Sequence, residues 1–312
     1  MILLDQRPYN AFLDYLANDV ASFLSSGQVQ LFAIATRAAQ YRIHAFSLYA
    51  QDTWNITPRL TATYGVRWEL SPAPAARGNT TLAAWQNVDN PGLLALAPPG
   101  TPLWSTTYAN FAPRLGIAYS LNPKGSLVLR AGWGLFYDLG SESVASLGST
   151  FPNSAATFVD AVSLPLTNPT SYLPALTTQP PYQTAIGYAP NLKLPRSHQW
   201  NVAIEKSLGR EQALSATYVG QAGRELLRQE GIPQPNDNFA GDFSLTRNNA
   251  FSNYHALQIQ YRKPVANRLH VLLNYTFSHS LDNASNDVQP LLSRDIISAS
   301  NDYASSDFDV RH

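Results

Sequence analysis

The sequence contains no cysteine, which excludes disulfides, thiolate nucleophiles and thiolate metal sites from this chain of 312 residues. No window approaches 18 consecutive apolar residues, which excludes a transmembrane helix. The 21 basic residues balance the 21 acidic ones, so the charge gives no reason to expect a nucleic-acid partner. Charged residues make up only 13% of the chain, whereas aromatic residues reach 11%.

What is present is a strict alternation of side-chain type. Within residues 59–70, one parity is apolar and the other is mostly polar, and the apolar set is Leu60, Ala62, Tyr64, Val66, Trp68 and Leu70. Because strand side chains alternate between faces, this segment predicts a strand with one apolar and one polar face. Residues 126–138 and 269–281 repeat the pattern. Paired strands with tight turns and long loops are typical of a transmembrane β-barrel with lipid outside and polar groups inside.

Eight strands are predicted, at residues 42–52, 59–70, 112–121, 126–138, 199–208, 213–220, 254–263 and 269–281. Short turns alternate with long connections rich in Pro, Asn, Ser and Gly, at residues 71–111, 139–198, 221–253 and 282–307. We expect those connections to be external loops, because outer-membrane barrels have short periplasmic turns and long external loops. The predicted fold class is all-β, an antiparallel up-and-down transmembrane β-barrel segment of about eight or nine strands.

The first 41 residues are harder to interpret. Residues 29–35 read as one more strand, and residues 11–24 read as a short helix or a loop. We therefore predict a barrel-entry segment at residues 1–41 and a partial barrel domain at residues 42–312. The start lacks a secretory signal, and residues 308–312 look like the opening of another strand, so we expect a piece of a longer chain.

Aromatic residues provide an independent test of the membrane interpretation. If the long loops lie outside, four aromatic side chains face lipid at the outer ends of their strands: Trp68, Tyr137, Trp200 and Phe277. Tyr119 and Tyr261 face lipid at the inner ends. Trp54 is expected in a short turn. Two aromatic belts are typical of membrane barrels. The alternative is that these rings fill the core of a soluble sandwich, which explains neither the belts nor the alternating loop lengths.

Several motifs resemble a known family. Residues 49–69 resemble a hairpin of TonB-dependent outer-membrane receptors, and residues 111–119 with 129–138 are similar to the next hairpin. Residues 218–226, 252–257, 275–283 and 307–312 resemble the Oar-like branch, whose members often carry a carboxypeptidase-regulatory-like domain ahead of the plug.

The resemblance implies a barrel of about 22 strands in the outer membrane of a Gram-negative-type bacterium. It also implies a plug domain inside the barrel and a short segment that contacts periplasmic TonB, and this sequence lacks both. The implied partners are outer-membrane lipid, TonB and an unknown solute, with no cofactor. The implied function is uptake or translocation of a large or scarce solute. The alternatives are a passive porin-like or adhesive barrel, and a soluble secreted β-protein with binding loops.

No catalytic constellation stands out, and we expect no enzyme activity. The six histidines form no HExxH motif, and we expect no metal site. The acidic and amide residues at 282–287 and 301–309 lack the spacing of a calcium loop, which favours a solvated external loop. Gly132 and Gly134 share the inward parity, which suggests room for a plug.

Two sets of residues are candidates for contact with a solute or plug. The lumen-facing candidates are Arg59, Arg67, Glu69, Arg130, Asp138 and Glu205, for which solvated or paired wall residues are the alternative. The external-loop candidates lie in the proline-rich connection 139–198 and are Phe151, Phe158, Tyr172, Tyr182 and Tyr188. Proline lowers the entropy cost of presenting such rings, and tyrosine adds a hydroxyl to its apolar area. A protective cover is the alternative for that loop.

Overall fold

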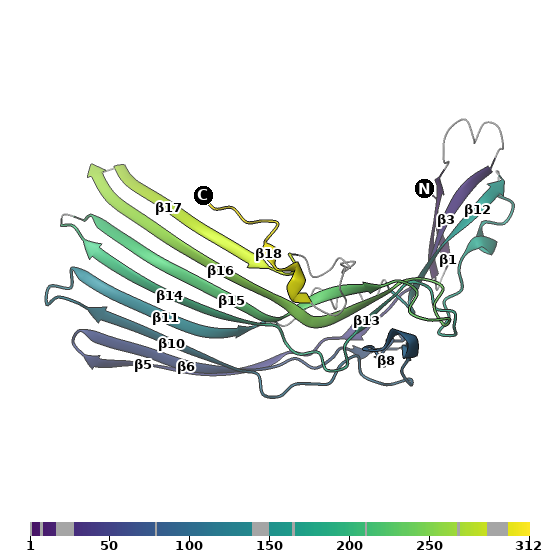
Figure 1. The fold of residues 1–312 in the computed structure, drawn as a ribbon, viewed down its shortest axis with the longest axis horizontal. Helices are drawn as coiled ribbons and strands as arrows, with labels where there is room; N and C mark the ends of the chain where they lie inside the picture. The colour runs from purple at the N-terminus through teal and green to yellow at the C-terminus, as the bar shows by residue number, and fades with distance from the viewer. Residues whose placement is uncertain are drawn as a thin grey trace.

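The computed structural model describes residues 2–6, 9–16, 28–78, 80–138, 150–163, 166–209, 211–266, 269–285 and 299–312. Its main feature is an antiparallel sheet of eight long strands: β5 (Phe46–Thr57), β6 (Leu60–Leu70), β10 (Phe111–Ser120), β11 (Leu127–Tyr137), β14 (Arg196–Ser207), β15 (Ala213–Ile232), β16 (Phe243–Ala266) and β17 (Leu269–Asp282). The sheet order is β18-β17-β16-β15-β14-β11-β10-β6-β5, with β18 (Ala304–Ser305) against β17. The described strands form an open, curved sheet, with short turns at one end and long connections at the other (Figure 1).

The strand register aligns the apolar side chains of neighbouring strands, so that they form one continuous apolar face. One row of directly paired residues runs across seven strands through Leu60, Tyr119, Leu129, Ile204, Ala216, Ile259 and Tyr275. The neighbouring row, on the other face, runs through Thr61, Ala118, Arg130, Ala203, Thr217, Gln258 and Thr276. Each of the eight predicted strands overlaps an observed strand, with different bounds for β5, β15 and β16, and the two-faced character of the sheet is confirmed.

The belt residues named from the sequence all share the apolar face in this register. Trp68 pairs with Phe111, Trp200 with Trp133, and Phe277 with Leu257. The prediction that Trp54 lies in a turn is wrong, because β5 continues to Thr57 and Trp54 pairs with Ala62 on the apolar face. Asp52 is an exception on this face, and its carboxylate accepts a hydrogen bond from Tyr64 Oη at 3.1 Å.

The predicted strand 213–220 and the predicted loop 221–253 are corrected by one long hairpin. β15 continues to Ile232 and β16 begins at Phe243, so most of the expected loop is paired strand. Residues 227–232 are all buried. Because neither face of this part of β15 meets solvent or lipid, its sequence does not show the alternation of polar and apolar residues that predicts a strand. Gly220 interrupts the apolar parity because Trp200 of β14 covers it, and a Cβ at Gly220 would lie 2.2 Å from the indole ring.

The N-terminal segment belongs to a second sheet. β1 (Ile2–Gln6), β2 (Tyr9–Leu16), β3 (Gln28–Arg37) and β12 (Ser154–Ser163) pair in the order β1-β2-β3-β12. Residues 29–35 are thus in a strand as predicted, whereas residues 11–16 form a strand and not a helix or loop. The remainder of the segment 11–24 lies outside the described residues. Because β3 pairs with a strand from the connection 139–198, this sheet joins distant parts of the chain.

The described parts of the long connections fold together into what we call the outer cap, made of residues 41–42, 71–78, 80–110, 150–153, 166–195, the hairpin 226–250 and residues 299–305. Its small elements are β4 (Tyr41–Arg42) paired with β7 (Ala75–Ala76), β8 (Trp85–Gln86) paired with β9 (Ala95–Leu96), β13 (Ala185–Tyr188) and the 3-10 turns η1 (Pro91–Leu93), η3 (Pro169–Tyr172) and η4 (Ala299–Asp302). β13 runs parallel to the outer part of β16. Within the described residues, no helix is both long and apolar enough to cross a membrane.

The outer cap contains the main buried cores of the molecule. Trp85 is at the centre of one core, and its ring contacts the rings of Phe151, Tyr182, Phe239 and Phe243 at centroid distances of 5.0–5.6 Å. A second core gathers Leu103, Tyr188, Leu192 and Leu227. The described parts of the long connections are therefore not solvated loops, because their apolar residues pack against one another as in a compact domain.

The open sheet predicts the behaviour of the isolated chain. β5 and β17 present strand edges, which cost several kcal/mol per unsatisfied group in hydrocarbon. Residues 1–312 expressed alone should aggregate or misinsert, which size-exclusion chromatography in detergent and in water will detect. A monodisperse, water-soluble monomer with a cooperative unfolding transition would contradict this expectation.

Candidate functional site: the polar wall and the outer cap

The face opposite the apolar one is a polar wall, and it places four of the six lumen candidates in strands. Arg130 Nε lies 3.1 Å from Glu205 Oε1 across β11 and β14, and both side chains remain largely exposed. Arg67 and Glu69, two residues apart on β6, also form an ion pair. Ser47 joins this pair, accepting from Arg67 Nη2 at 3.0 Å and donating to Glu69 Oε2 at 2.6 Å. Their contact with a solute or plug stays a prediction.

The other two lumen candidates lie at opposite ends of the sheet. Arg59 is in the tight turn between β5 and β6, where its backbone N–H donates to Thr57 Oγ1 at 3.2 Å. Asp138 follows the last residue of β11, and its backbone N–H donates to the Pro195 carbonyl at 2.9 Å. The structure therefore does not bring all six candidates together. Each ion pair on the polar wall joins residues of one strand or of two neighbouring strands.

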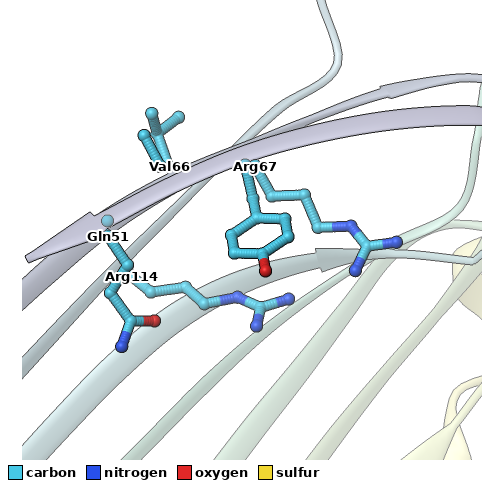
Figure 2. A pocket seen from close by; sticks show the side chains of 7 residues that line it. Gln51, Val66, Arg67 and Arg114 are labelled. Atoms are coloured by element: carbon cyan, nitrogen blue, oxygen red, sulfur yellow. The ribbon is translucent and has the colours of Figure 1, made fainter.

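A small pocket of about 180 Å³ opens on the polar wall near the outer ends of β5, β6 and β10. It is lined by Tyr49, Ala50, Gln51, Gly65, Val66, Arg67 and Arg114. Figure 2 shows the Arg67 and Arg114 side chains extending in the same direction beside each other, with Val66 on the opposite side of its strand. Sequence reasoning did not select Arg114, although its parity, opposite to that of Leu115 and Ile117, marks it as a wall residue.

Gly132 and Gly134 lie on the polar wall, and neighbouring side chains pack close to both. A Cβ at Gly134 would lie 2.9 Å from the Phe136 ring and 3.3 Å from Arg114 Cγ. At Gly132, a Cβ would lie 3.3 Å from the Asn201 side chain. Neighbouring wall side chains therefore occupy the space next to these glycines, and the room for a plug stays a prediction.

The five external-loop candidates fall into two groups. Phe151, Tyr182 and Tyr188 are buried in the two cap cores, which leaves little ring surface for a solute in this arrangement. Phe158 of β12 is 57% exposed and stacks on Phe32 of β3 at a centroid distance of 4.6 Å. Tyr172 packs at the edge of a small core around Leu31. A recognition role for these residues stays a prediction.

Sequence reasoning missed a buried charge network in the outer cap. Arg228 of β15 is fully buried, forms an ion pair with Asp302 and donates to the Asn283 carbonyl at 3.1 Å. Arg247, opposite it on β16, lies 3.2 Å from Glu230 and 3.2 Å from Asp89. The charged residues of the predicted loop 221–253 do not indicate this network, because their burial depends on distant segments that cover them.

The expected solvated loop at residues 282–287 is corrected within the described residues. Asp282 and Asn283 are buried, and the Asn283 amide donates at 2.9 Å to the carbonyls of both Asn249 and Ala299. Asn283 Oδ1 accepts from the Phe251 N–H at 2.8 Å. In the part of the chain that the structure describes, no group of three or more His, Cys, Asp or Glu could hold a metal ion.

Comparisons with known proteins give one match that spans nearly the whole chain. Residues 5–312 match the family model described as "Outer membrane beta barrel domain". No curated protein matches the chain.

Several solved structures resemble the chain at low sequence identity. The outer membrane transporter YddB from Escherichia coli is 10% identical with a TM-score of 0.49, over 88% of this chain and 34% of that one. The siderophore receptor PirA from Pseudomonas aeruginosa is 11% identical with a TM-score of 0.43, over 88% of this chain and 44% of that one. This chain thus spans less than half the length of either protein. Because the family model covers both the sheet and the outer cap, the chain belongs to the outer membrane β-barrel domain family and is a protein of the outer membrane.

Proposed function

We propose that the complete protein is a TonB-dependent transporter of the Oar-like type, which takes up or translocates a large or scarce solute. The observation that supports this most is the continuous polar wall, which ends at a mouth whose long connections are folded into the outer cap. A simple conduit needs only the wall, whereas a folded cap gives the outer mouth a surface able to select what enters.

The sequence motifs support the same proposal, because they fall on neighbouring strands of one sheet. The motif at residues 49–69 forms the β5–β6 hairpin, and the motif at 129–138 lies in β11. Residues 275–283 complete β17, where Asn283 ties the strand end to the cap. A plug and a TonB-contacting segment are required of the complete protein. No catalytic role is proposed for this chain.

The proposal is tested on the complete parent protein, purified from outer membranes. In planar lipid bilayers it should stay closed, because a plug blocks the lumen, and it should retain the periplasmic domain of TonB in a pull-down assay. Deletion of the TonB-contacting segment should abolish retention without changing insertion. Steady ohmic conductance with no TonB retention would instead identify a passive porin-like barrel.

A further inference from the structure

The pocket on the polar wall is shaped by an unusual pairing of large and small residues. In one row across the sheet, Gln51 pairs with Gly65, and Gly65 pairs with Arg114. In the next row outward, Tyr49 pairs with Arg67. A Cβ at Gly65 would lie 2.8 Å from the Ala50 carbonyl oxygen and 3.1 Å from Gln51 Cβ. Gly65 therefore lets the β5 backbone approach closely, and it lines the pocket between Gln51 and Arg114.

Arg114 forms no ion pair with any residue that the structure describes. Among the residues that the structure describes, no side chain or carbonyl accepts a hydrogen bond from its guanidinium, and no carboxylate lies within ion-pair distance. Two other wall arginines are paired, Arg67 with Glu69 and Arg130 with Glu205, whereas Arg262 near the inner end of β16 has no ion pair among the described residues. A guanidinium carries five N–H donors in a fixed plane, so Arg114 presents its hydrogen-bonding capacity to the lumen.

The Arg114 side chain is also held in position. Its guanidinium carbon lies 4.4 Å from the centroid of the Phe136 ring, an arrangement in which the cation is attracted to the ring face. Gly134, paired with Arg114 across β10 and β11, gives the ring and the arginine stem the room for this contact. A pre-positioned guanidinium loses less entropy when it binds a planar oxyanion.

The charge of the pocket selects the class of ligand. Arg67, Arg114 and Glu69 leave one net positive charge, and the Tyr49 hydroxyl and Gln51 amide add neutral donors. We propose that Arg114, with Gln51 and Tyr49 and with Arg67 at the outer edge, forms a lumenal binding site for a carboxylate or phosphate group. The oxyanion comes either from a passing solute or from an acidic side chain of a protein segment that enters the lumen. The site is expected in an energised and in a passive barrel alike.

The test uses the complete parent protein in detergent at low salt, with citrate as the probe and its uncharged trimethyl ester as the neutral counterpart. Calorimetric titration should detect citrate and not the ester. Arg114→Gln should weaken citrate binding by at least about tenfold, because charge-assisted bidentate bonds are lost. Arg114→Lys should restore only part of the affinity, because an ammonium lacks the planar fork. Arg262→Gln, which removes the same charge near the inner end of β16 on the polar wall, should stay within about twofold of the unmodified protein.

The expected results of these experiments depend on whether the oxyanion comes from a solute or from a protein segment. If a protein carboxylate occupies the site, the unmodified protein should not bind citrate, whereas Arg114→Gln should make the lumenal segment more sensitive to protease by about tenfold. Heat-modifiable mobility on gels verifies that each variant is folded. The proposal is overturned by equal citrate binding in the unmodified protein and Arg114→Gln. It is equally overturned if citrate does not bind and protease sensitivity does not change.

Discussion

Arginine in place of Ile259 should destabilise the complete barrel by about 2–4 kcal/mol, the cost of a lipid-facing arginine at the bilayer midplane. Ile259 lies on the apolar face, paired with Ala216 and Tyr275. Along β16 it lies between Tyr261 of the inner aromatic belt and Leu257, whose partner Phe277 belongs to the outer belt. A guanidinium at this depth has neither water nor a counterion, so the folded state in lipid bears the whole penalty.

The adjacent residue provides a matched control. Gln258 precedes Ile259 on the same strand and lies on the polar wall, paired with Thr217 and Thr276. Gln258→Arg should therefore cost much less than Ile259→Arg. Leu273→Arg should fall between them, because Leu273 pairs with Tyr261 and is closer to the inner interface. Urea titrations of the complete protein in lipid vesicles measure all three. Equal penalties at Ile259 and Gln258 would refute the assignment of the two faces.

Loss of the Arg228 side chain should be the most damaging change in the outer cap. Arg228→Met leaves the Asn283 carbonyl without its donor and Asp302 without its cation, whereas the Ala299 carbonyl keeps the Asn283 amide as a donor. Breaking a buried ion pair costs about 3–5 kcal/mol, and we expect the lower end because Asp302 is 39% exposed and can turn towards water. The hairpin of β15 and β16 and the segment at residues 299–305 should separate, because Arg228 joins them.

Limited proteolysis and denaturant unfolding of the complete protein will measure this effect. Arg228→Met should expose the outer cap to protease while the membrane strands stay protected, because only the cap contains the network. Arg262→Met is the control, since Arg262 lies on β16, is exposed and has no ion pair among the described residues. The double variant Arg228→Met with Asp302→Leu should recover part of the stability. Protection unchanged from that of the Arg262→Met protein would rule out a role for Arg228 in holding the cap.

The membrane part of the fold was readable from the sequence. Lipid on one side and a polar lumen on the other impose a period of two on every spanning strand, and turn residues mark the inner ends. Strands β6 and β11 accordingly lie within one residue of their predicted bounds. The prediction for β5 was displaced by several residues because its turn is tighter than the polar residues near Pro58 suggested, with β5 ending at Thr57.

The polar wall was predictable in composition but not in pairing. Parity alone placed Arg67, Arg130 and Glu205 on one face, and the register then joined Arg130 to Glu205 at 3.1 Å. Arg114 has the same parity, yet its lack of a partner depends on Gly65 and Gly134 on the two neighbouring strands. A single strand carries no information about which residue lies opposite it, so the pocket could not be derived from local pattern.

Only the tertiary structure decided the outer cap. β3 pairs with β12 and β13 pairs with β16, contacts between segments that are remote in the sequence. The outer parts of β15 and β16 are covered by cap residues 83–103 and 182–192, so the burial of their side chains does not alternate and the segment reads as a loop. Burial on several sides removes the period-two signal that the membrane imposes elsewhere. The sequence by itself therefore determined where the chain crosses the bilayer, and long-range packing determined what covers its outer end.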